Sequence, residues 1–425
     1  MNRIVQIFKI KDLRNKVLFV AGLLIVYRVL SAIPIPGVDS LKLQNYFNSN
    51  QLLGFLNFFS GGGLSNLSVV MLGVGPYITA TIIMQLLTMI FPKFKELYYE
   101  EGARGRAKFN QYSRLLTVPL GIVQAYGFLN ILIRGGVINQ PDTFGIWTNV
   151  IIITAGSMLA LWLGELITEK KIGNGISLII LAGILSGMPG YIVQLQVSYP
   201  LTPEHLPTYI GFLIVAILAV AGVVYLNEGE RKIPVAYARR VRGNKMYGGS
   251  QSYLPLKINQ AGMIPLIFAI SVLLFPQFLA SALSFISPDL AVKANDIVSR
   301  VLNNQLFYGT FYFLLVFIFT YFYTAITFNP EEVAKNLQRS GGFVPGIRPG
   351  EATTAFFKKV VNRITFFGAF SLGIIAILPT IIEKMTGIQL LSISGTALLI
   401  VVSVALETMR QINSQLDIRE YDQTG

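Results

Sequence analysis

The sequence predicts an all-helical membrane protein that crosses the bilayer ten times. The first observation behind this prediction is composition, because hydrophobic residues make up 53% of the 425 positions and charged residues only 13%. The second is the division of the chain into ten long apolar runs, and the third is the placement of most basic residues on one side of those runs. Together they argue against a soluble globular chain.

The apolar runs are the predicted membrane spans. A helix needs ~17–25 apolar residues to cross a hydrocarbon core. The runs are residues 17–35, 66–92, 115–133, 143–164, 172–203, 205–227, 258–288, 301–330, 364–382 and 385–406. All are free of charge except the first, which carries Arg28 beside Tyr27. We interpret Arg28 as a side chain that extends to the outer interface, with a role in conduction as the alternative.

The distribution of basic residues predicts the orientation. With ten spans both termini lie on one side, and 28 of the 34 Lys and Arg residues fall on that side. The others are Arg28, Lys42, Arg134, Lys293, Arg300 and Lys384. Because loops rich in Lys and Arg stay in the cytoplasm, we expect both termini to be cytoplasmic.

One stretch is too long for a single span. Residues 43–92 contain fifty positions without a charge, but a second crossing there would place the basic connection 92–114 outside. We therefore expect one span and one element that enters the membrane without crossing it. The candidate is Leu52–Phe59, followed by Ser60-Gly61-Gly62-Gly63, where three glycines allow the backbone to turn back. An interfacial helix on the outer leaflet is the alternative.

Residues with catalytic or coupling chemistry are few inside the spans. Amides occur at Gln85 and Asn259, but no paired carboxylates or Ser-His pair lie there, which argues against an enzyme. Gly-Lys never occurs, so the chain lacks a phosphate-binding loop, and energy must come from a partner or an ion gradient. With no cysteine and one histidine, the loop residue His205, we expect no metal and no cofactor.

Two cytoplasmic connections are longer than a link requires. Residues 229–257 contain alternating Ile233, Val235 and Tyr237, typical of an extended arm, with further Arg and Tyr nearby. Residues 340–350 form a Gly- and Pro-rich loop that presents Arg348. We expect a docking surface, and RNA binding there would weaken with salt. The alternative is that both connections only set topology.

A set of motifs runs along nearly the whole chain. In order they are Ile33-Pro34-Ile35-Pro36-Gly37, Phe59-Ser60-Gly61-Gly62, Pro76-Tyr77-Ile78, Gln85-Leu86-Leu87-Thr88, Trp162-Leu163-Gly164-Glu165, Ile172-Gly173-Asn174-Gly175-Ile176-Ser177 and Phe343 to Gly350. In combination they resemble the SecY family, the channel subunits of the bacterial protein translocon. The resemblance implies two inverted, pseudo-symmetric five-helix halves, 1–200 and 201–425, with a re-entrant plug at about 52–66 and cytoplasmic loops 229–257 and 329–363.

The resemblance also implies the function. A protein-conducting channel of the cell inner membrane would pass unfolded polypeptides across and release transmembrane segments laterally into lipid. An inverted-repeat solute transporter is the alternative, although it would need a specific midplane site. The implied partners are the SecE and SecG subunits, the SecA ATPase, the ribosome through its rRNA, signal peptides, nascent polypeptides and membrane lipids.

Motif alignment implies a ring of aliphatic side chains at the channel constriction and a plug beside it. The ring residues are Val74, Ile78, Ile176, Ile180, Ile267 and Ile400. Spacing of four residues places each of the first two pairs on one helix face, although periodicity alone would predict ordinary packing residues. Valine at 74 departs from the more familiar isoleucine and widens the expected ring slightly. The plug residues are Phe55, Leu56, Asn57, Phe58, Phe59, Ser60, Gly61, Gly62, Gly63 and Leu64.

Gate and docking residues follow from the same alignment. Gln85 and Asn259 match the polar cluster of a lateral gate between the second and seventh spans. The docking residues for the SecA ATPase and the ribosome are Arg231, Lys232, Arg239, Arg240, Lys245 and Arg348. Asn244 stands where a basic residue is often found, which puts the ribosome contact at that position in question.

Overall fold

Each of the ten predicted apolar runs coincides with one helix. The computed structural model describes residues 9–36, 64, 66–99, 101–134, 136–138, 142–198, 206–237, 240–242, 245–247, 251–283, 287–386 and 389–424. The ten helices are α2 (Lys11–Ala32), α5 (Gly75–Ile90), α7 (Gly102–Arg134), α8 (Thr143–Glu169), α9 (Gly175–Ser198), α10 (Leu206–Glu228), α11 (Ile264–Ala282), α13 (Gln305–Thr327), α15 (Glu351–Thr386) and α16 (Gln389–Thr424). The predicted fold class, an all-helical polytopic membrane protein, is confirmed.

Helix length and composition agree with a membrane protein. Within the described residues six helices are long and apolar enough to cross a membrane, and a seventh span results if α5 and α6 (Pro92–Tyr99) form one bent unit. The bend between these two helices is 110°. Pro92 explains the break, because proline lacks the N–H that would continue the helix. The apolar parts of α9 and α11, Gly175–Gly190 and Ile264–Gln277, are shorter.

The structure differs from the predicted runs at their edges. Residues 66–74 form turns, so the second span starts as a helix only at Gly75. Leu67 and Gly73 have φ values of 41° and 50°, a left-handed conformation that cannot continue an α-helix. Conversely α7, α15 and α16 extend past their apolar runs into charged sequence, because helix propagation continues in water once a span has nucleated it. Two further helices, α12 (Pro288–Asn303) and α14 (Pro330–Arg339), occupy polar connections.

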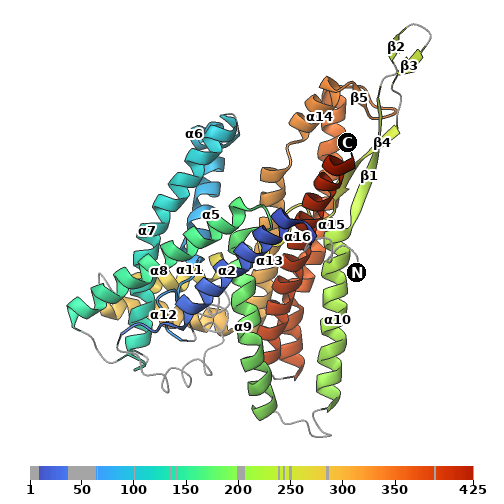
Figure 1. Cartoon of the computed structure of the whole chain (residues 1–425). Helices are drawn as coiled ribbons and strands as arrows, with labels where there is room; N and C mark the ends of the chain where they lie inside the picture. Colours follow the sequence, from blue (N-terminus) through green and yellow to red (C-terminus); the bar gives the residue numbers. More distant parts are fainter. Residues whose placement is uncertain are drawn as a thin grey trace. The chain divides into compact units, whose positions relative to one another are not determined.

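The chain folds into two compact units, each assembled from separate stretches of sequence. The first comprises Met1–Leu213, Ile270–Tyr308 and Pro379–Gly425, and the second comprises Ile214–Ala269 and Gly309–Leu378. In the first unit α7 packs against α5 and α8, while α9 packs against α8 and α16 (Figure 1). The predicted division into halves 1–200 and 201–425 stays a prediction.

The second unit carries a small antiparallel sheet on a helical core. Its strands are β1 (Glu230–Tyr237), β4 (Gln251–Lys257) and β5 (Gly342–Phe343), in the order β4-β1-β5, next to α14 and α15 (Figure 1). The predicted extended arm is therefore confirmed as strand β1, with Ile233 and Val235 buried. The core beneath the sheet consists of Ile233, Leu256, Ala334, Val344, Phe357, Val360, Val361 and Ile364. This core joins the connection 229–257 to the connection 329–363.

Candidate functional site

The aliphatic residues predicted for the constriction lie at four places in the fold. Val74 is the N-cap of α5 and Ile78 lies one turn later; Ile176 and Ile180 occupy the first turns of α9; Ile267 lies on α11 and Ile400 on α16. Five of the six are buried, with at most 5% of the side chain exposed, and Ile176 is half-buried. Ile267 belongs to the second unit and the other five to the first, so closure of a ring stays a prediction.

A glycine turn sets the position of Ile176 and Ile180. The Asn174 Oδ1 atom accepts hydrogen bonds from the backbone N–H groups of Ile176 and Ser177 at 3.1 and 3.3 Å, which caps α9. A Cβ atom on Gly175 would collide with the carbonyl oxygen of Gly164 on α8. The Gly-Asn-Gly motif therefore lets α9 begin in direct backbone contact with α8.

The predicted plug is attached at a paired stretch of backbone. Of the plug residues only Leu64 is described, and it is buried; Phe55 to Gly63 lie outside the described residues. On either side of residues 37–63, the Ile35 N–H donates to the Leu67 carbonyl at 2.8 Å and the Val69 N–H donates to the Ile33 carbonyl at 3.0 Å. These two bonds form a β-bridge, so the intervening segment leaves and returns at one point of the fold.

Both predicted gate amides are buried. The Asn259 Nδ2 group donates to the Asn227 Oδ1 atom at 2.8 Å and to the Gly262 carbonyl at 2.9 Å. The Oε1 atom of Gln85 and the Oδ1 atom of Asn259 have no hydrogen-bond partner among the described residues. A buried acceptor without a donor costs free energy, so neither oxygen stabilises the position it occupies here. Gln85 and Asn259 belong to different units, and their pairing stays a prediction.

Asn227 is a polar partner that the sequence interpretation missed. It lies near the end of α10 and is buried, with its Oδ1 atom bound to Asn259. The only feature of the sequence that pointed to Asn227 was its place as a single amide at the end of the apolar run 205–227. Nothing in the local pattern connects that amide to a residue 32 positions later.

The basic residues predicted for docking include four that lie on strands, namely Arg231, Lys232, Arg240 and Lys245. Arg231 and Lys232 are exposed on β1, where they stand opposite Leu256 and Pro255 of β4. The backbone continues into a two-stranded ribbon, β2 (Arg240–Arg242) paired with β3 (Lys245–Tyr247). Arg239 and Asn244 lie outside the described residues.

Arg348 is an exposed side chain on a fixed backbone. The loop is anchored by buried Val344, whose carbonyl accepts from the Ile347 N–H at 3.1 Å. The Thr353 hydroxyl donates to the Arg348 carbonyl at 2.8 Å. Gly346 has a φ of 81° and Gly350 a φ of 103°, conformations that suit glycine. Because β5 pairs with Ala236 and Tyr237, this loop follows directly from a strand joined to the end of β1.

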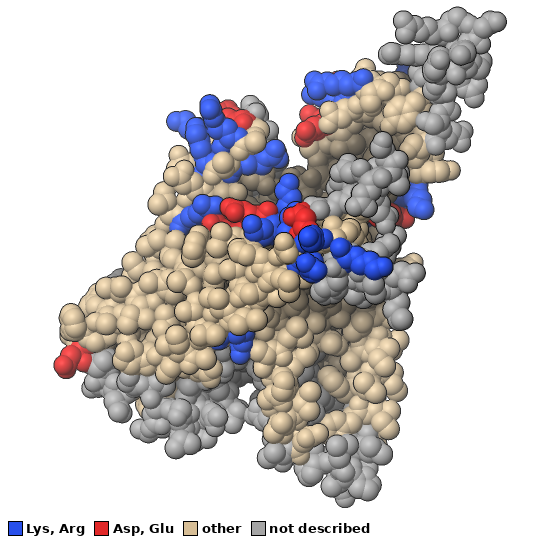
Figure 2. Space-filling view, viewed as in Figure 1, with Lys and Arg blue, Asp and Glu red and all other residues tan. Residues whose placement is uncertain are grey.

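Basic side chains also gather at one end of the first unit. Figure 2 shows Lys and Arg concentrated over α6 and the start of α7. The described basic residues there are Lys93, Lys95, Arg104, Arg106 and Lys108. Farther along α7, Arg114 forms an ion pair with Glu165 of α8. This arrangement agrees with a membrane protein whose charged helix ends lie in water.

Comparison with known proteins finds similarity to one family along nearly the whole chain. A family model described as SecY matches residues 68–409. The protein translocase subunit SecY of Mycobacterium bovis is 40% identical, and the match covers 97% of this chain and 96% of that protein. A solved structure concerning the plug domain of the SecY protein superposes with a TM-score of 0.66 at 20% identity, covering 93% and 90% of the two chains. Sec61 in the canine ribosome-channel complex gives a TM-score of 0.63 at 19% identity, covering 94% and 91%.

Proposed function

We infer that this chain, which belongs to the SecY family of protein translocase subunits, is a protein-conducting channel. The single observation that carries this function is 40% identity to a curated translocase subunit over 97% of the chain. Such a subunit passes unfolded polypeptides across a membrane and releases transmembrane segments into lipid. It is a non-enzymatic part of a translocase. We propose that both termini lie in the cytoplasm and that the membrane is the cell inner membrane.

We propose that the aliphatic residues at positions 74, 78, 176, 180, 267 and 400 form the constriction. Their side chains carry no group that could replace the hydration shell of an ion, so a narrow ring of them blocks ions by dewetting. The same absence of polar groups prevents strong binding to any one side chain of a passing polypeptide. The burial of Val74, Ile78, Ile180, Ile267 and Ile400 supports this role.

We propose a lateral gate between α5 and α11, with Gln85 and Asn259 beside it. An apolar segment gains free energy by entering lipid, whereas one charge at its centre costs ~2.5–3.5 kcal/mol on the insertion scale. A hydrogen bond between helices in a membrane contributes only ~0.6–2 kcal/mol, so such a gate can open again. The burial of both amides supports the proposal.

We propose that Arg231, Lys232, Arg239, Arg240, Lys245 and Arg348 dock the SecA ATPase and the ribosome. The exposure of Arg231, Lys232 and Arg348 supports this, as does the β1–β5 pairing that joins their segments. Small SecE and SecG subunits would complete the membrane complex.

A reconstitution experiment tests the function. Proteoliposomes containing this chain with SecE and SecG should protect a secretory preprotein from added protease when SecA and ATP are supplied. Omission of ATP is the matched control. Uptake of a small solute at a rate that saturates with its concentration, without protection of preprotein, would favour the solute transporter instead.

Deletion of residues 55–63 should increase ion leakage through the resting channel. The proposed plug would be lost, while the paired ends at Ile35–Leu67 and Ile33–Val69 remain to close a shortened loop. Single-channel conductance in planar bilayers measures the leak. Replacing the same residues by an equally long Gly-Ser segment is the control for length. Conductance equal to that of the unaltered protein in both variants would contradict the plug assignment.

A disulfide between Gln85→Cys and Asn259→Cys should block insertion of transmembrane segments. The crosslink would hold the two sides of the gate together, and the chain has no native cysteine to compete for the new thiols. The measurement is the membrane-inserted fraction of a test segment before and after reduction. Full insertion by the oxidised protein would contradict the gate, as would failure of the block to reverse with reductant.

A further inference from the structure

The sequence contains one Asn-Gly pair, Asn174-Gly175, in the turn between α8 and α9. An asparagine before glycine is prone to spontaneous deamidation, because glycine has no side chain to hinder attack by its own backbone nitrogen. In that reaction the Gly175 nitrogen bonds to the Asn174 Cγ atom, the bond from Cγ to Nδ2 breaks, and ammonia leaves with the Gly175 proton. Water then opens the resulting succinimide ring at either carbonyl, which gives aspartate or isoaspartate.

The attacking nitrogen is engaged in the folded protein. The Gly175 N–H donates to the Oγ1 atom of Thr168 on α8 at 2.9 Å, and the Thr168 hydroxyl donates to the Gly164 carbonyl at 2.8 Å. This hydrogen bond must break before the nitrogen can lose its proton and attack. Close packing adds a second restraint, since a Cβ atom on Gly175 would collide with the Gly164 carbonyl oxygen.

The amide under attack is engaged as well. The Asn174 Oδ1 atom accepts from the backbone N–H groups of Ile176 and Ser177 at 3.1 and 3.3 Å. The Asn174 carbonyl accepts the Leu178 N–H at 2.9 Å, so the residue is the N-cap of α9. Ring closure requires the side chain to leave both of its bonds and turn toward the Gly175 nitrogen.

We propose that this turn protects Asn174 from deamidation and that the protection depends on the hydroxyl of Thr168. The aspartate product would still cap α9, because Asp and Asn are equally good N-caps. Isoaspartate is the damaging product, since it inserts a methylene group into the main chain at the start of α9. That insertion lies two residues before Ile176, where α9 meets α8.

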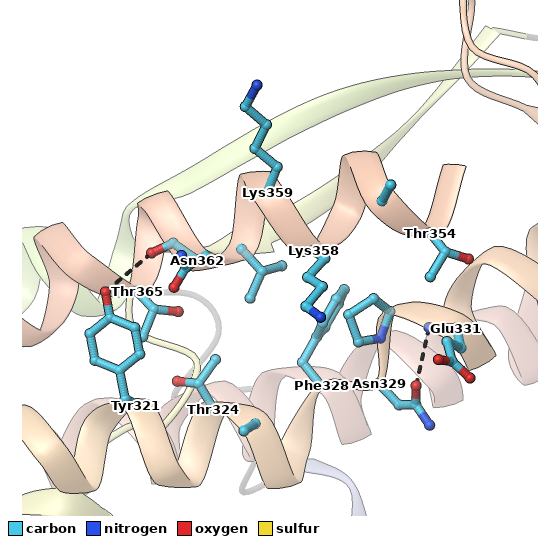
Figure 3. Close-up of a pocket in the computed structure, with 14 residues that line it drawn as sticks. Tyr321, Thr324, Phe328, Asn329, Glu331, Thr354, Lys358, Lys359, Asn362 and Thr365 are labelled. Carbon is cyan, nitrogen blue, oxygen red and sulfur yellow. Dashed lines mark hydrogen bonds between the residues drawn. The ribbon is translucent and has the colours of Figure 1, made fainter. Parts of the chain in front are cut away.

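A second capped asparagine supplies an internal reference. Asn329 caps α14 in the same way, because its Oδ1 atom accepts from the backbone N–H groups of Glu331 and Glu332 at 3.1 and 3.4 Å. Figure 3 shows the first of these bonds. The next residue is Pro330, whose nitrogen carries no proton and cannot attack. Asn329 should therefore keep its amide in the folded and in the unfolded chain.

Peptide mass spectrometry of the purified full chain, incubated in detergent at mildly alkaline pH, tests the proposal. The measure is the rate at which residue 174 gains the mass of an acid. The folded protein should react more slowly than the same chain in guanidinium chloride, by about tenfold or more, since at least two hydrogen bonds must open. Thr168→Val keeps the shape of the side chain but loses the acceptor. It should raise the folded-state rate about 5-fold, the effect of one hydrogen bond on local opening.

Two further variants make the test specific. Thr168→Ser keeps a hydroxyl and should restore the slow rate. Thr148→Val removes a hydroxyl of the same helix that donates to the Phe144 carbonyl at 2.8 Å, and it should leave the rate at residue 174 unchanged.

Three results would overturn the proposal. Equal rates in the folded and the unfolded chain would show that the turn gives no protection. An unchanged rate in Thr168→Val would remove the role of the hydroxyl, and an equal rise in Thr148→Val would assign the effect to a general loosening of α8. The unfolding temperature of Thr168→Val separates the lost bond from lost structure. If that variant does not fold, the comparison of the folded with the unfolded unaltered chain still decides whether the turn protects Asn174.

Discussion

Arg348→Glu should reduce SecA-driven translocation about 30-fold or more at limiting SecA. Arginine side chains often dominate the free energy of an interface, and removing one partner of a buried charge pair costs ~2–5 kcal/mol. The Thr353 hydroxyl bonds the Arg348 carbonyl and the Ile347 N–H bonds the Val344 carbonyl, so the loop presents the Arg348 side chain from an ordered backbone. Charge reversal then adds repulsion to the lost contact. The measurement is the initial rate of preprotein protection in proteoliposomes as SecA is varied.

Lys335→Glu is the matched control for Arg348→Glu. Lys335 is exposed on α14, in the same unit but in a different element, so its reversal changes the net charge equally. We expect that variant to keep more than half of the rate. Equal losses in both variants would indicate a general charge effect, and a normal rate in Arg348→Glu would remove the docking role.

The spans could be predicted because membrane insertion leaves a local signal. A run such as 143–164 must be apolar over its full length, and α8 covers it from Thr143 to Glu169. The turns before Gly75 left no such signal. They depend on a positive φ at Leu67, a residue type that rarely adopts it, and on pairing with Ile33 and Ile35.

Contacts between distant segments could not be predicted either, because they leave no local signal in the sequence. The alternation in 233–237 predicted an extended arm, but its pairing with β5 joins Ala236 to Phe343. Likewise, Asn259 was recognised as a polar residue in an apolar run, whereas its partner Asn227 could not be chosen among the chain's amides. The aligned constriction residues share this limit, since burial of an isoleucine looks the same in a ring and in a core.

Gly175→Ala should strongly destabilise the folded protein, although alanine adds only a methyl group. The added Cβ would collide with the Gly164 carbonyl oxygen and approach the Ile167 Cβ to 2.9 Å, so α8 and α9 must separate. The clash involves a backbone carbonyl, so no rotation of a side chain can relieve it. Overpacking costs ~1–3 kcal/mol and more where the backbone must move, against a total stability of ~5–15 kcal/mol. Yield and unfolding temperature in detergent measure the loss.

Gly190→Ala, in the same helix, is the control that makes this prediction specific. A Cβ at Gly190 meets no atom within 4 Å, and alanine is the better helix former by ~0.5–1 kcal/mol. We expect Gly190→Ala to fold at least as well as the unaltered protein. If Gly175→Ala folds equally well, α8 and α9 do not meet at this glycine. Any folded fraction of Gly175→Ala should leak ions, because moving the start of α9 displaces Ile176 and Ile180 together.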